Sequence, residues 1–352
     1  MKEKKYINRR SFLQKTTAGL GLSIIGKSGF SSASEESLKN VKRSIGFRLP
    51  REVWAASITL YNLRNKTQEE RIERMLKRME EVVPFQPDII CLTEIFPDAM
   101  ISGLLPIPER AEIIPGPIVR RIAEFAKTNG CYVICPLHTK KGDYAFNTAV
   151  LISRDGTVVG EYHKIHPTES EMRDGVTPGP VNPPVFKTDF GKIGILICFD
   201  ANWPDKWRSL KDSGAEIIFW PSAFEGGRML NSLAWNNNYY IVSCTWSAPA
   251  RIIDITGDEL FTSGRLQSWV CAPINLDKEV FHWDYQGGKV KAIQEKYGEK
   301  VDVKIYHPEG WFTLESRSPD VTLAQVIEEF ELVTYDSYIK RAGRNQDKKR
   351  PG

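Results

Sequence analysis

The sequence contains little of what several protein classes depend on. Only 6 of its 352 residues are cysteine and only 5 are histidine, too few for a disulfide scaffold and a weak basis for a metal centre. No apolar run approaches the roughly 20 residues that span a bilayer. Charged residues make up 26% and hydrophobic residues 41%, which excludes extended disorder and predicts a globular chain with one large domain or two small ones.

Four common active-site motifs are also absent from the sequence. It has no Gly-x-Ser-x-Gly elbow, no Walker phosphate loop, no Gly-x-Gly-x-x-Gly after a strand and no His-Glu-x-x-His. These patterns mark serine hydrolases, nucleotide-binding folds and zinc proteases. The chemistry of this chain therefore has to be sought elsewhere.

Positive charge is concentrated at the beginning of the chain. Residues 1–33 hold seven lysines and arginines and one acidic residue, Glu3, so the net charge of this segment is +6. The net charge of the whole chain is +4, which leaves −2 for the remaining residues. A near-neutral body argues against nucleic acid as a partner.

The same segment resembles an export signal. Residues 8–15 read NRRSFLQK, a twin-arginine pattern, and a weakly apolar run over 16–26 and small residues at 31–34 follow. We expect a twin-arginine signal peptide over residues 1–33, cleavage near Ala33, recognition by the twin-arginine export machinery and a periplasmic or secreted protein. The apolar run is too short for a stable membrane anchor. The alternative is a frayed basic terminus. An oxidising compartment permits disulfides, and Cys131 and Cys135 are near enough in sequence to be considered as a pair.

From residue 52 onward, apolar strand patterns alternate with amphipathic helical patterns. This alternation predicts an α/β fold in layers, with sheets shielded by helices. An Asp-Gly turn at 155–156 between two apolar runs predicts a hairpin. The predicted strands cover 53–60, 89–92, 131–136, 147–153, 158–163, 193–198, 216–220 and 239–245, and the predicted helices 67–83, 118–127 and 204–212. Residues 285–352 are more polar, and we expect an extension that packs on the domain or on a partner subunit.

Three polar residues stand where predicted strands end: Glu94, Lys164 and Cys198. Ligands in open α/β sheets bind beyond the carboxyl ends of the strands, so these side chains could converge on one site. Taken singly, each has an ordinary interpretation: a capping acid, a solvated lysine and a small buried apolar residue.

The chemistry of this combination is coherent. A thiol with a pKa near ~8.5 is mostly protonated at neutral pH, so a carboxylate can take its proton as it attacks. After attack on an amide-like carbon, Lys164 and the backbone N–H of Phe199 could hold the negative oxygen. Glu94 would then protonate the departing nitrogen and activate water.

Several ordered motifs resemble the nitrilase, or carbon–nitrogen hydrolase, superfamily. They are residues 87–94 (PDIICLTE), 146–152 (FNTAVLI), 155–156 (DG), 160–167 (GEYHKIHP), 177–179 (TPG), 194–200 (GILICFD) and 214–222 (GAEIIFWPS). The resemblance implies a carbon–nitrogen hydrolase domain over 52–284, a four-layer αββα sandwich, catalytic Glu94, Lys164 and Cys198, no metal or other cofactor, and a homodimer or higher homo-oligomer. It also implies a second glutamate after the lysine, with Glu171 as the choice and Glu169 as the runner-up.

The resemblance also bears on the substrate. Nitrile-cleaving members carry Trp-Glu after the cysteine, whereas this chain has Phe199-Asp200, which favours a small amide or N-carbamoyl (ureido) compound and release of ammonia or an amine. By the same resemblance the substrate-binding residues are Phe199, Asn202, Trp203 and Phe224. The alternatives are a nitrilase, a non-catalytic binding member of the fold, and a metal hydrolase using His163 and His166, which period-two alternation would send to opposite faces of a strand.

Overall fold

The structure, a computed structural model, describes residues 48–247, 249–264 and 266–351. The signal peptide expected at residues 1–33 lies outside the described residues. Within the described part of the chain, no helix is long and apolar enough to cross a membrane.

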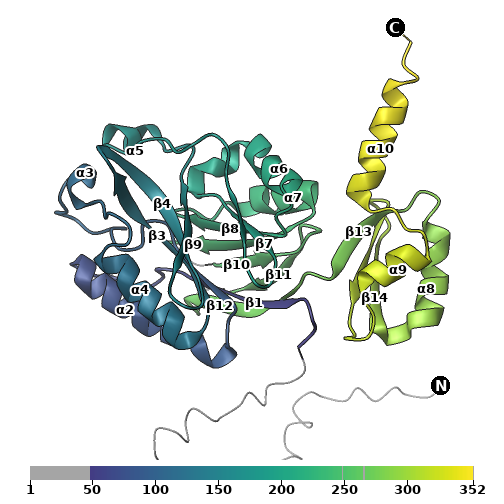
Figure 1. Cartoon of the computed structure of the whole chain (residues 1–352), viewed down its shortest axis with the longest axis horizontal. Helices are drawn as coiled ribbons and strands as arrows, with labels where there is room; N and C mark the ends of the chain where they lie inside the picture. Colours follow the sequence, from purple (N-terminus) through teal and green to yellow (C-terminus); the bar gives the residue numbers. More distant parts are fainter. Residues whose placement is uncertain (1–47, 248, 265, 352) are drawn as a thin grey trace, which may run out of the picture. The chain divides into compact units, whose positions relative to one another are not determined.

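Two six-stranded sheets form the middle layers of the fold (Figure 1). The first contains, in spatial order, β12 (Trp269–Asn275), β1 (Glu52–Ile58), β2 (Ile89–Leu92), β3 (Tyr132–Lys141), β4 (Tyr144–Ile152) and β5 (Val158–His163). The second contains β11 (Glu259–Thr262), β10 (Arg251–Ile253), β9 (Tyr240–Thr245), β8 (Ile217–Ser222), β7 (Lys192–Ile195) and β6 (Val185–Lys187). Strands β1, β2 and β3 run parallel in the first sheet, as do β7, β8 and β9 in the second. All other neighbouring strands in the two sheets are antiparallel.

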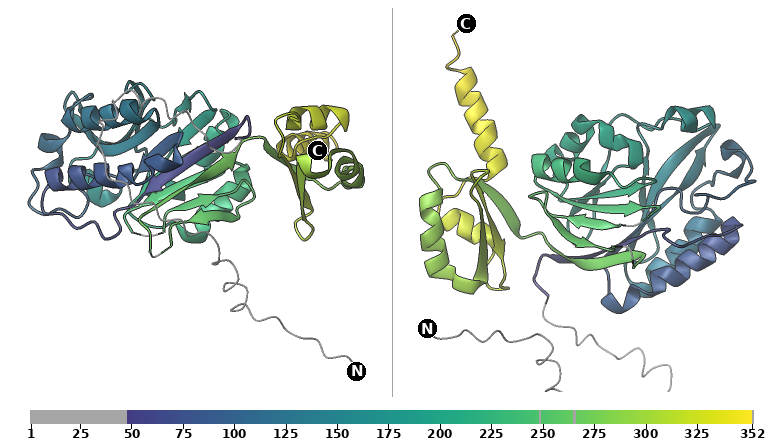
Figure 2. Two further views of the ribbon diagram at one scale, coloured as in Figure 1. Left: turned by 90° about the horizontal axis from the view of Figure 1, so that it is seen from below. Right: turned by 180° about the vertical axis from the view of Figure 1, so that it is seen from behind.

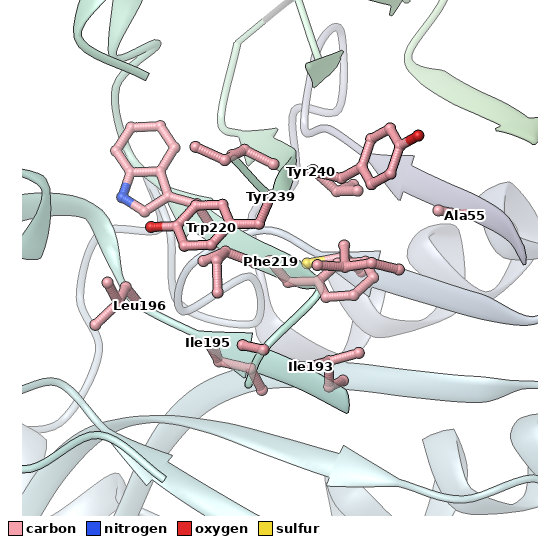
Figure 3. Close-up of a cluster of buried hydrophobic side chains, with 14 of the residues drawn as sticks. Ala55, Ile193, Ile195, Leu196, Phe219, Trp220, Tyr239 and Tyr240 are labelled. Carbon is pink, nitrogen blue, oxygen red and sulfur yellow. The ribbon is translucent and has the colours of Figure 1, made fainter. Parts of the chain in front are cut away.

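An apolar layer fills the space between the sheets, where β1 and β2 contact β8 and β9. Strands buried on both faces read as continuous apolar runs, as β2 and β8 do. Figure 3 shows part of the buried apolar cluster that includes this layer, with Ala55, Ile193 and Phe219 among the labelled side chains. Its members include Ala55, Ile89, Cys91, Ile193, Ile195, Phe219 and Tyr240.

Helices cover the outer face of each sheet (Figure 2). On the first sheet lie α2 (Gln68–Glu80) and α4 (Pro117–Asn129), and on the second α6 (Pro204–Asp212) and α7 (Gly227–Asn237). The α2 helix begins where the Thr67 hydroxyl accepts a hydrogen bond from the Glu70 N–H, and Ile72, Met75 and Met79 form its buried stripe. Two short helices, α3 (Ile107–Arg110) and α5 (Glu169–Arg173), lie in the connections. The expected four-layer αββα sandwich is thus confirmed.

The hairpin predicted from Asp155-Gly156 joins β4 to β5. Gly156 has φ +84°, a left-handed conformation that favours glycine. A Cβ there would lie 2.8 Å from the Ala123 carbonyl oxygen, so the turn also needs glycine for its close approach to α4. This hairpin places the end of β5, and with it Lys164, at the edge of the first sheet.

Two strand ends differ most from the sequence prediction. β7 stops at Ile195 rather than at 198, because residues 198–202 form a 3-10 helix. β3 continues through Pro136 to Lys141 instead of ending at 136. Its pairing with β2 stops at Ile134, so Pro136 meets no strand on that side among the described residues, and its missing N–H leaves no ladder bond unmade there.

After β12 the chain builds a smaller sheet with its own apolar core. Strands β13 (Lys278–His282), β15 (Trp311–Ser316) and β14 (Val301–Tyr306) pair in that order, with α8 (Val290–Tyr297), α9 (Leu323–Glu329) and α10 (Tyr335–Asp347) beside them. The core contains Phe281, Ile293, Phe312 and Val326. This sheet begins at Lys278, inside the range we expected for the hydrolase domain rather than at 285. Trp311 stacks on Trp235 of α7 at 3.7 Å, so the unit packs on the sandwich.

Candidate active site

Cys198 occupies a sharp turn just after β7. Its φ is +48°, in the left-handed region that non-glycine residues seldom adopt. It opens the 3-10 helix Cys198–Asn202, and its carbonyl oxygen accepts a hydrogen bond from Trp220 Nε1 at 3.1 Å. A buried tryptophan on the neighbouring strand therefore helps to hold this unusual backbone conformation.

Asp200 ties the cysteine turn to the segment that carries the lysine. Its Oδ2 accepts hydrogen bonds from the Ile197 N–H at 2.9 Å and from the Tyr162 hydroxyl at 2.6 Å. Its Oδ1 lies 2.9 Å from both the backbone nitrogen and Nδ1 of His166. Asp200 is fully buried, and its four contacts fix the two segments next to each other.

Glu94 follows β2 and is buried. The Thr93 hydroxyl lies 3.0 Å from the carbonyl oxygen of Ser222, at the end of β8, which locks this end of the first sheet onto the second. Oε1 of Glu94 accepts hydrogen bonds from Lys164 Nζ and Asn147 Nδ2, both at 2.8 Å. Oε2 is buried and has no hydrogen-bond partner among the described residues.

Lys164 lies between two carboxylates. Its side chain is 1% exposed, and Nζ contacts Glu171 at 2.8 Å from Oε2 and 3.0 Å from Oε1, in addition to Glu94. Burial by itself lowers the pKa of Lys164, but the charges of Glu94 and Glu171 and the hydrogen bond to Glu171 outweigh burial and hold this pKa above its ordinary value. The lysine is thus a permanent cation at the site.

The structure brings Glu171, and not Glu169, to the lysine. Glu171 lies in α5, where it forms a capping box with Thr168, whereas Glu169 is exposed two residues earlier. Burial raises the pKa of Glu171, but Lys164 and the hydrogen bonds from Thr168 and Asn147 overcome this and lower it. The capping box sets which carboxylate of this short helix turns inward.

The Cys198 thiol is held in its neutral form. Burial raises its pKa, the Glu94 charge raises it further, and Lys164, Ala223 and Ser222 act against both, with a resulting pKa of about 12. Glu94 and Lys164 are therefore near enough to act on the thiol electrostatically. A nucleophile in this state needs a base that takes its proton during attack.

The expected substrate-binding residues lie around the cysteine turn. Phe199 is 36% and Phe224 39% exposed, and they pack edge-on against Trp203 and Trp220 respectively. Trp203 also stacks on His166 at 3.8 Å. Asn202 is exposed, and its amide donates to the Phe199 carbonyl oxygen at 3.0 Å. Two half-exposed phenylalanines beside the thiol form an apolar rim.

The structure adds three residues that sequence reasoning did not assign to the site: Asn147, Asp200 and Ser222. All three are fully buried. The sequence did contain a signal for Asn147, which is a polar residue at an inward-facing position of an otherwise apolar strand. Burying an amide is costly unless it is hydrogen-bonded.

The structure also bears on two other hypotheses from the sequence, a metal site at His163 and His166 and a disulfide between Cys131 and Cys135. His163 Nδ1 lies 2.8 Å from the Thr148 hydroxyl, whereas His166 contacts Asp200, so the two rings do not share one site. Cys131 and Cys135 are both free thiols, as are the other four cysteines. The considered disulfide is not present.

Residues 55–274 match the family model described as carbon-nitrogen hydrolase. This range exceeds half of the chain and contains both six-stranded sheets except the first residues of β1 and the last of β12. The chain therefore belongs to the carbon–nitrogen hydrolase family.

Two curated relatives illustrate the similarity. A deaminated glutathione amidase of Synechocystis sp. is 32% identical over 160 residues, which cover 38% of this chain and 59% of the relative. A beta-ureidopropionase of Arabidopsis thaliana is 32% identical over 147 residues, covering 40% of this chain and 36% of the relative. The chain thus spans between about a third and three fifths of the length of these relatives.

A solved structure supports the fold. A mutant of the amidase from Nesterenkonia sp. AN1, with the acetamide moiety of fluoroacetamide covalently added at its active-site cysteine, has a TM-score of 0.55 to this chain at 15% identity. The match covers 71% of this chain and 99% of that one.

Proposed function

We propose that this protein hydrolyses the carbon–nitrogen bond of a small amide or ureido compound through a Cys198 acyl-enzyme. The observation that carries the proposal is the buried cluster in which Lys164 bridges Glu94 and Glu171 beside the neutral Cys198 thiol. Each of these groups is costly to bury, and together they supply a nucleophile, a base and a fixed cation.

Acylation begins when Sγ of Cys198 attacks the carbonyl carbon and its proton passes to Glu94 Oε2, the carboxylate oxygen without a hydrogen-bond partner among the described residues. The carbonyl electron pair moves to the oxygen, which the charge of Lys164 and the backbone N–H of Phe199 stabilise. One such donor typically contributes about 3–4 kcal/mol. The tetrahedral intermediate then collapses: the carbon–nitrogen bond breaks, and Glu94 returns its proton to the leaving nitrogen as ammonia or an amine is released.

Deacylation uses the same groups in the same order. Glu94 takes a proton from water, whose oxygen attacks the thioester carbon. The carbon–sulfur bond breaks, the acid product leaves, and the Cys198 sulfur recovers a proton from Glu94. Lys164 and Glu171 undergo no net change and keep the site charged in a fixed geometry.

Amide and ureido substrates fit the relatives better than nitriles do. One relative is named an amidase, another a ureidopropionase, and Phe199-Asp200 follows the cysteine where nitrile-cleaving members carry Trp-Glu. The apolar rim of Phe199 and Phe224, with Asn202 and Trp203 beside it, favours a small substrate with an apolar part.

The decisive experiment measures ammonia release from panels of small amides, ureido acids and nitriles with the wild type and Cys198→Ala. We expect turnover of at least one amide or ureido acid and its loss in the variant. Cys244→Ala, which alters another buried free thiol, is the matched control and should keep activity. Equal rates for Cys198→Ala and wild type would reject the nucleophile, turnover of nitriles alone would reject the substrate class, and an inactive but folded wild type would favour a binding protein.

Export through the twin-arginine pathway is part of the proposal. It rests on residues 8–15 and the +6 charge of residues 1–33. Cell fractionation should recover the wild type from the periplasm or medium, and replacement of Arg9 and Arg10 by lysine should retain the protein inside the cell. Equal export of both proteins would contradict this assignment.

Assembly into a homodimer or larger homo-oligomer also remains a proposal, drawn from the family resemblance. Light scattering coupled to size-exclusion chromatography should give at least twice the mass of the purified chain, which is 40.0 kDa before the signal peptide is removed. A monomer across the working concentration range would reject it.

A further inference from the structure

Asn147 occupies a position between the two carboxylates of the site. It lies on β4, on the same face as Ala149 and Leu151, whose side chains belong to the layer between the sheets. Its backbone carbonyl oxygen accepts a hydrogen bond from the Lys164 N–H at 2.8 Å. The fully buried Asn147 side chain therefore enters the site from the strand next to the lysine.

The amide nitrogen of Asn147 has two hydrogens, and the structure divides them between two acids. Nδ2 lies 2.8 Å from Glu94 Oε1 and 2.8 Å from Glu171 Oε1, so these two oxygens are at most 5.6 Å apart. Lys164 Nζ contacts the same two oxygens. With two carboxylates and one ammonium, the group carries an excess negative charge whose repulsion is strong away from water.

These contacts make the two oxygens of Glu94 unequal. Oε1 accepts from both Asn147 and Lys164, whereas Oε2 is buried with no partner among the described residues. A carboxylate held by one oxygen at two donors cannot rotate without losing both hydrogen bonds, each of which is charge-assisted. The geometry leaves Oε2 as the oxygen for proton exchange.

We propose that Asn147 is a positioning residue that orients Glu94 Oε2 toward proton exchange with Cys198 and keeps Glu94 and Glu171 charged beside one lysine. This inference rests on the proposed function. Lys164 supplies the charge, but a single ammonium cannot set the orientation of two acids and offset their mutual repulsion at once. The neutral amide adds two donors without adding a charge that would stabilise the thiolate or pair off the base.

Other titratable groups face Asn147 as well. Cys198 and Lys164 lie within the site, and His138 of β3 is the cross-strand partner of Asn147. His138 Nδ1 bonds Asp98 at 2.5 Å, and Asp98 pairs with Arg110. A change in pH dependence after substitution at 147 must therefore be compared with a variant that leaves this second group intact.

The test compares pH profiles of kcat/KM for wild type, Asn147→Leu and the isosteric Asn147→Asp. The substrate is the amide or ureido acid that the ammonia-release panel identifies. Loss of the two donors should lower kcat about 10- to 100-fold with little change in KM. It should also move the acidic limb of kcat/KM to higher pH, because the acids then retain their protons, and Asn147→Asp, with a third carboxylate, should move it further. Asn237→Leu is the matched control, since Asn237 is a buried helix asparagine whose amide, among the described residues, donates to Leu233 alone.

A second readout needs no substrate: the pH dependence of Cys198 alkylation by iodoacetamide, followed by mass spectrometry. At the pH at which the thiol ionises, both acids are charged, and loss of the two donors leaves their charge less compensated. The acidic limb of alkylation should therefore also move to higher pH in both Asn147 variants. Wild-type kcat and an unmoved limb in a folded variant overturn the proposal, as does a loss of kcat with an unmoved limb or losses matched by Asn237→Leu. Absence of turnover in the wild type, with limbs that still move, would reject the proposed function and not the role of Asn147.

Discussion

Glu94 has a double effect on the nucleophile, and the two effects have opposite signs. Its charge, after burial, raises the pKa of Cys198, so it suppresses the thiolate in the resting protein. Its unpartnered Oε2 provides the base that removes the proton during attack. Glu94 therefore makes the resting Cys198 thiol less acidic and also supplies the base that the attack of this thiol requires.

Glu94→Gln separates these effects. Removal of the carboxylate charge should lower the pKa of Cys198 and speed its alkylation at pH 8–9, while amide turnover falls about 10²–10⁴-fold because the general base is gone. Rates of iodoacetamide labelling and of ammonia release check the two halves. Turnover that rises together with labelling would show that thiolate formation alone limits the reaction.

Asp98 gives a residue-level prediction about stability. Burial raises the pKa of its carboxyl, but the hydrogen bonds and charges of His138 and Arg110 outweigh burial and lower it. A depressed folded-state pKa contributes stability that is present above the unfolded value, near ~3.9, and is lost as pH falls through the folded value.

In urea unfolding, Asp98→Asn should therefore reduce the free energy of unfolding at pH 6 and reduce it much less at pH 3. The exposed Asp302→Asn serves as control and should change little at either pH. An equal loss from Asp98→Asn at both pH values would mean that packing, rather than the charge of Asp98, is responsible.

At the scale of elements, the site depends on how the ends of β2, β5 and β7 are fastened together. Asp200 fastens the turn after β7 to the end of β5 through Ile197, Tyr162 and His166. Thr93 fastens the end of β2 to that of β8. These links, rather than Glu94, Lys164 and Cys198 themselves, determine the distances between the reacting groups.

Asp200→Asn replaces a carboxylate, whose two oxygens both accept hydrogen bonds, by an amide whose NH2 group would face existing donors. We expect a loss of about 2–4 kcal/mol in the free energy of unfolding and a large loss of kcat, since hydrogen bonds to a buried charge are worth about 1.5–3 kcal/mol each. Tyr162→Phe, which removes one of the four contacts and leaves Asp200 in place, should cost less than Asp200→Asn. Chemical denaturation and steady-state kinetics provide the comparison, and an Asp200→Asn protein as stable and active as wild type would contradict it.

At the scale of the whole described chain, the C-terminal sheet is coupled to the sandwich by a few buried contacts. Trp311 is 4% exposed and stacks on Trp235 of α7. Lys278 Nζ lies 2.9 Å from Oδ2 of the buried Asp254. The smaller core of Phe281, Phe312 and Val326 lies behind these contacts.

Trp311→Ala should lower the free energy of unfolding by about 3–5 kcal/mol, the usual cost of truncating a buried aromatic residue. Trp283, on the same unit but 41% exposed, is the matched control, and Trp283→Ala should cost clearly less. Guanidinium unfolding followed by circular dichroism measures both. Similar losses in the two variants would show that the Trp235–Trp311 stack does not couple the two parts.

The sequence by itself determined the alternation of strands and helices, the hairpin turn at Gly156 and the three reactive residues at strand ends, because period, turn chemistry and buried polarity are local properties. It could not decide between Glu169 and Glu171, or reveal that Asn147 joins two acids and Asp200 joins two segments. It also missed that a new sheet starts at Lys278. These features depend on which strands are stacked and in what register, and contacts between residues far apart in the chain exist only once the tertiary structure brings them together.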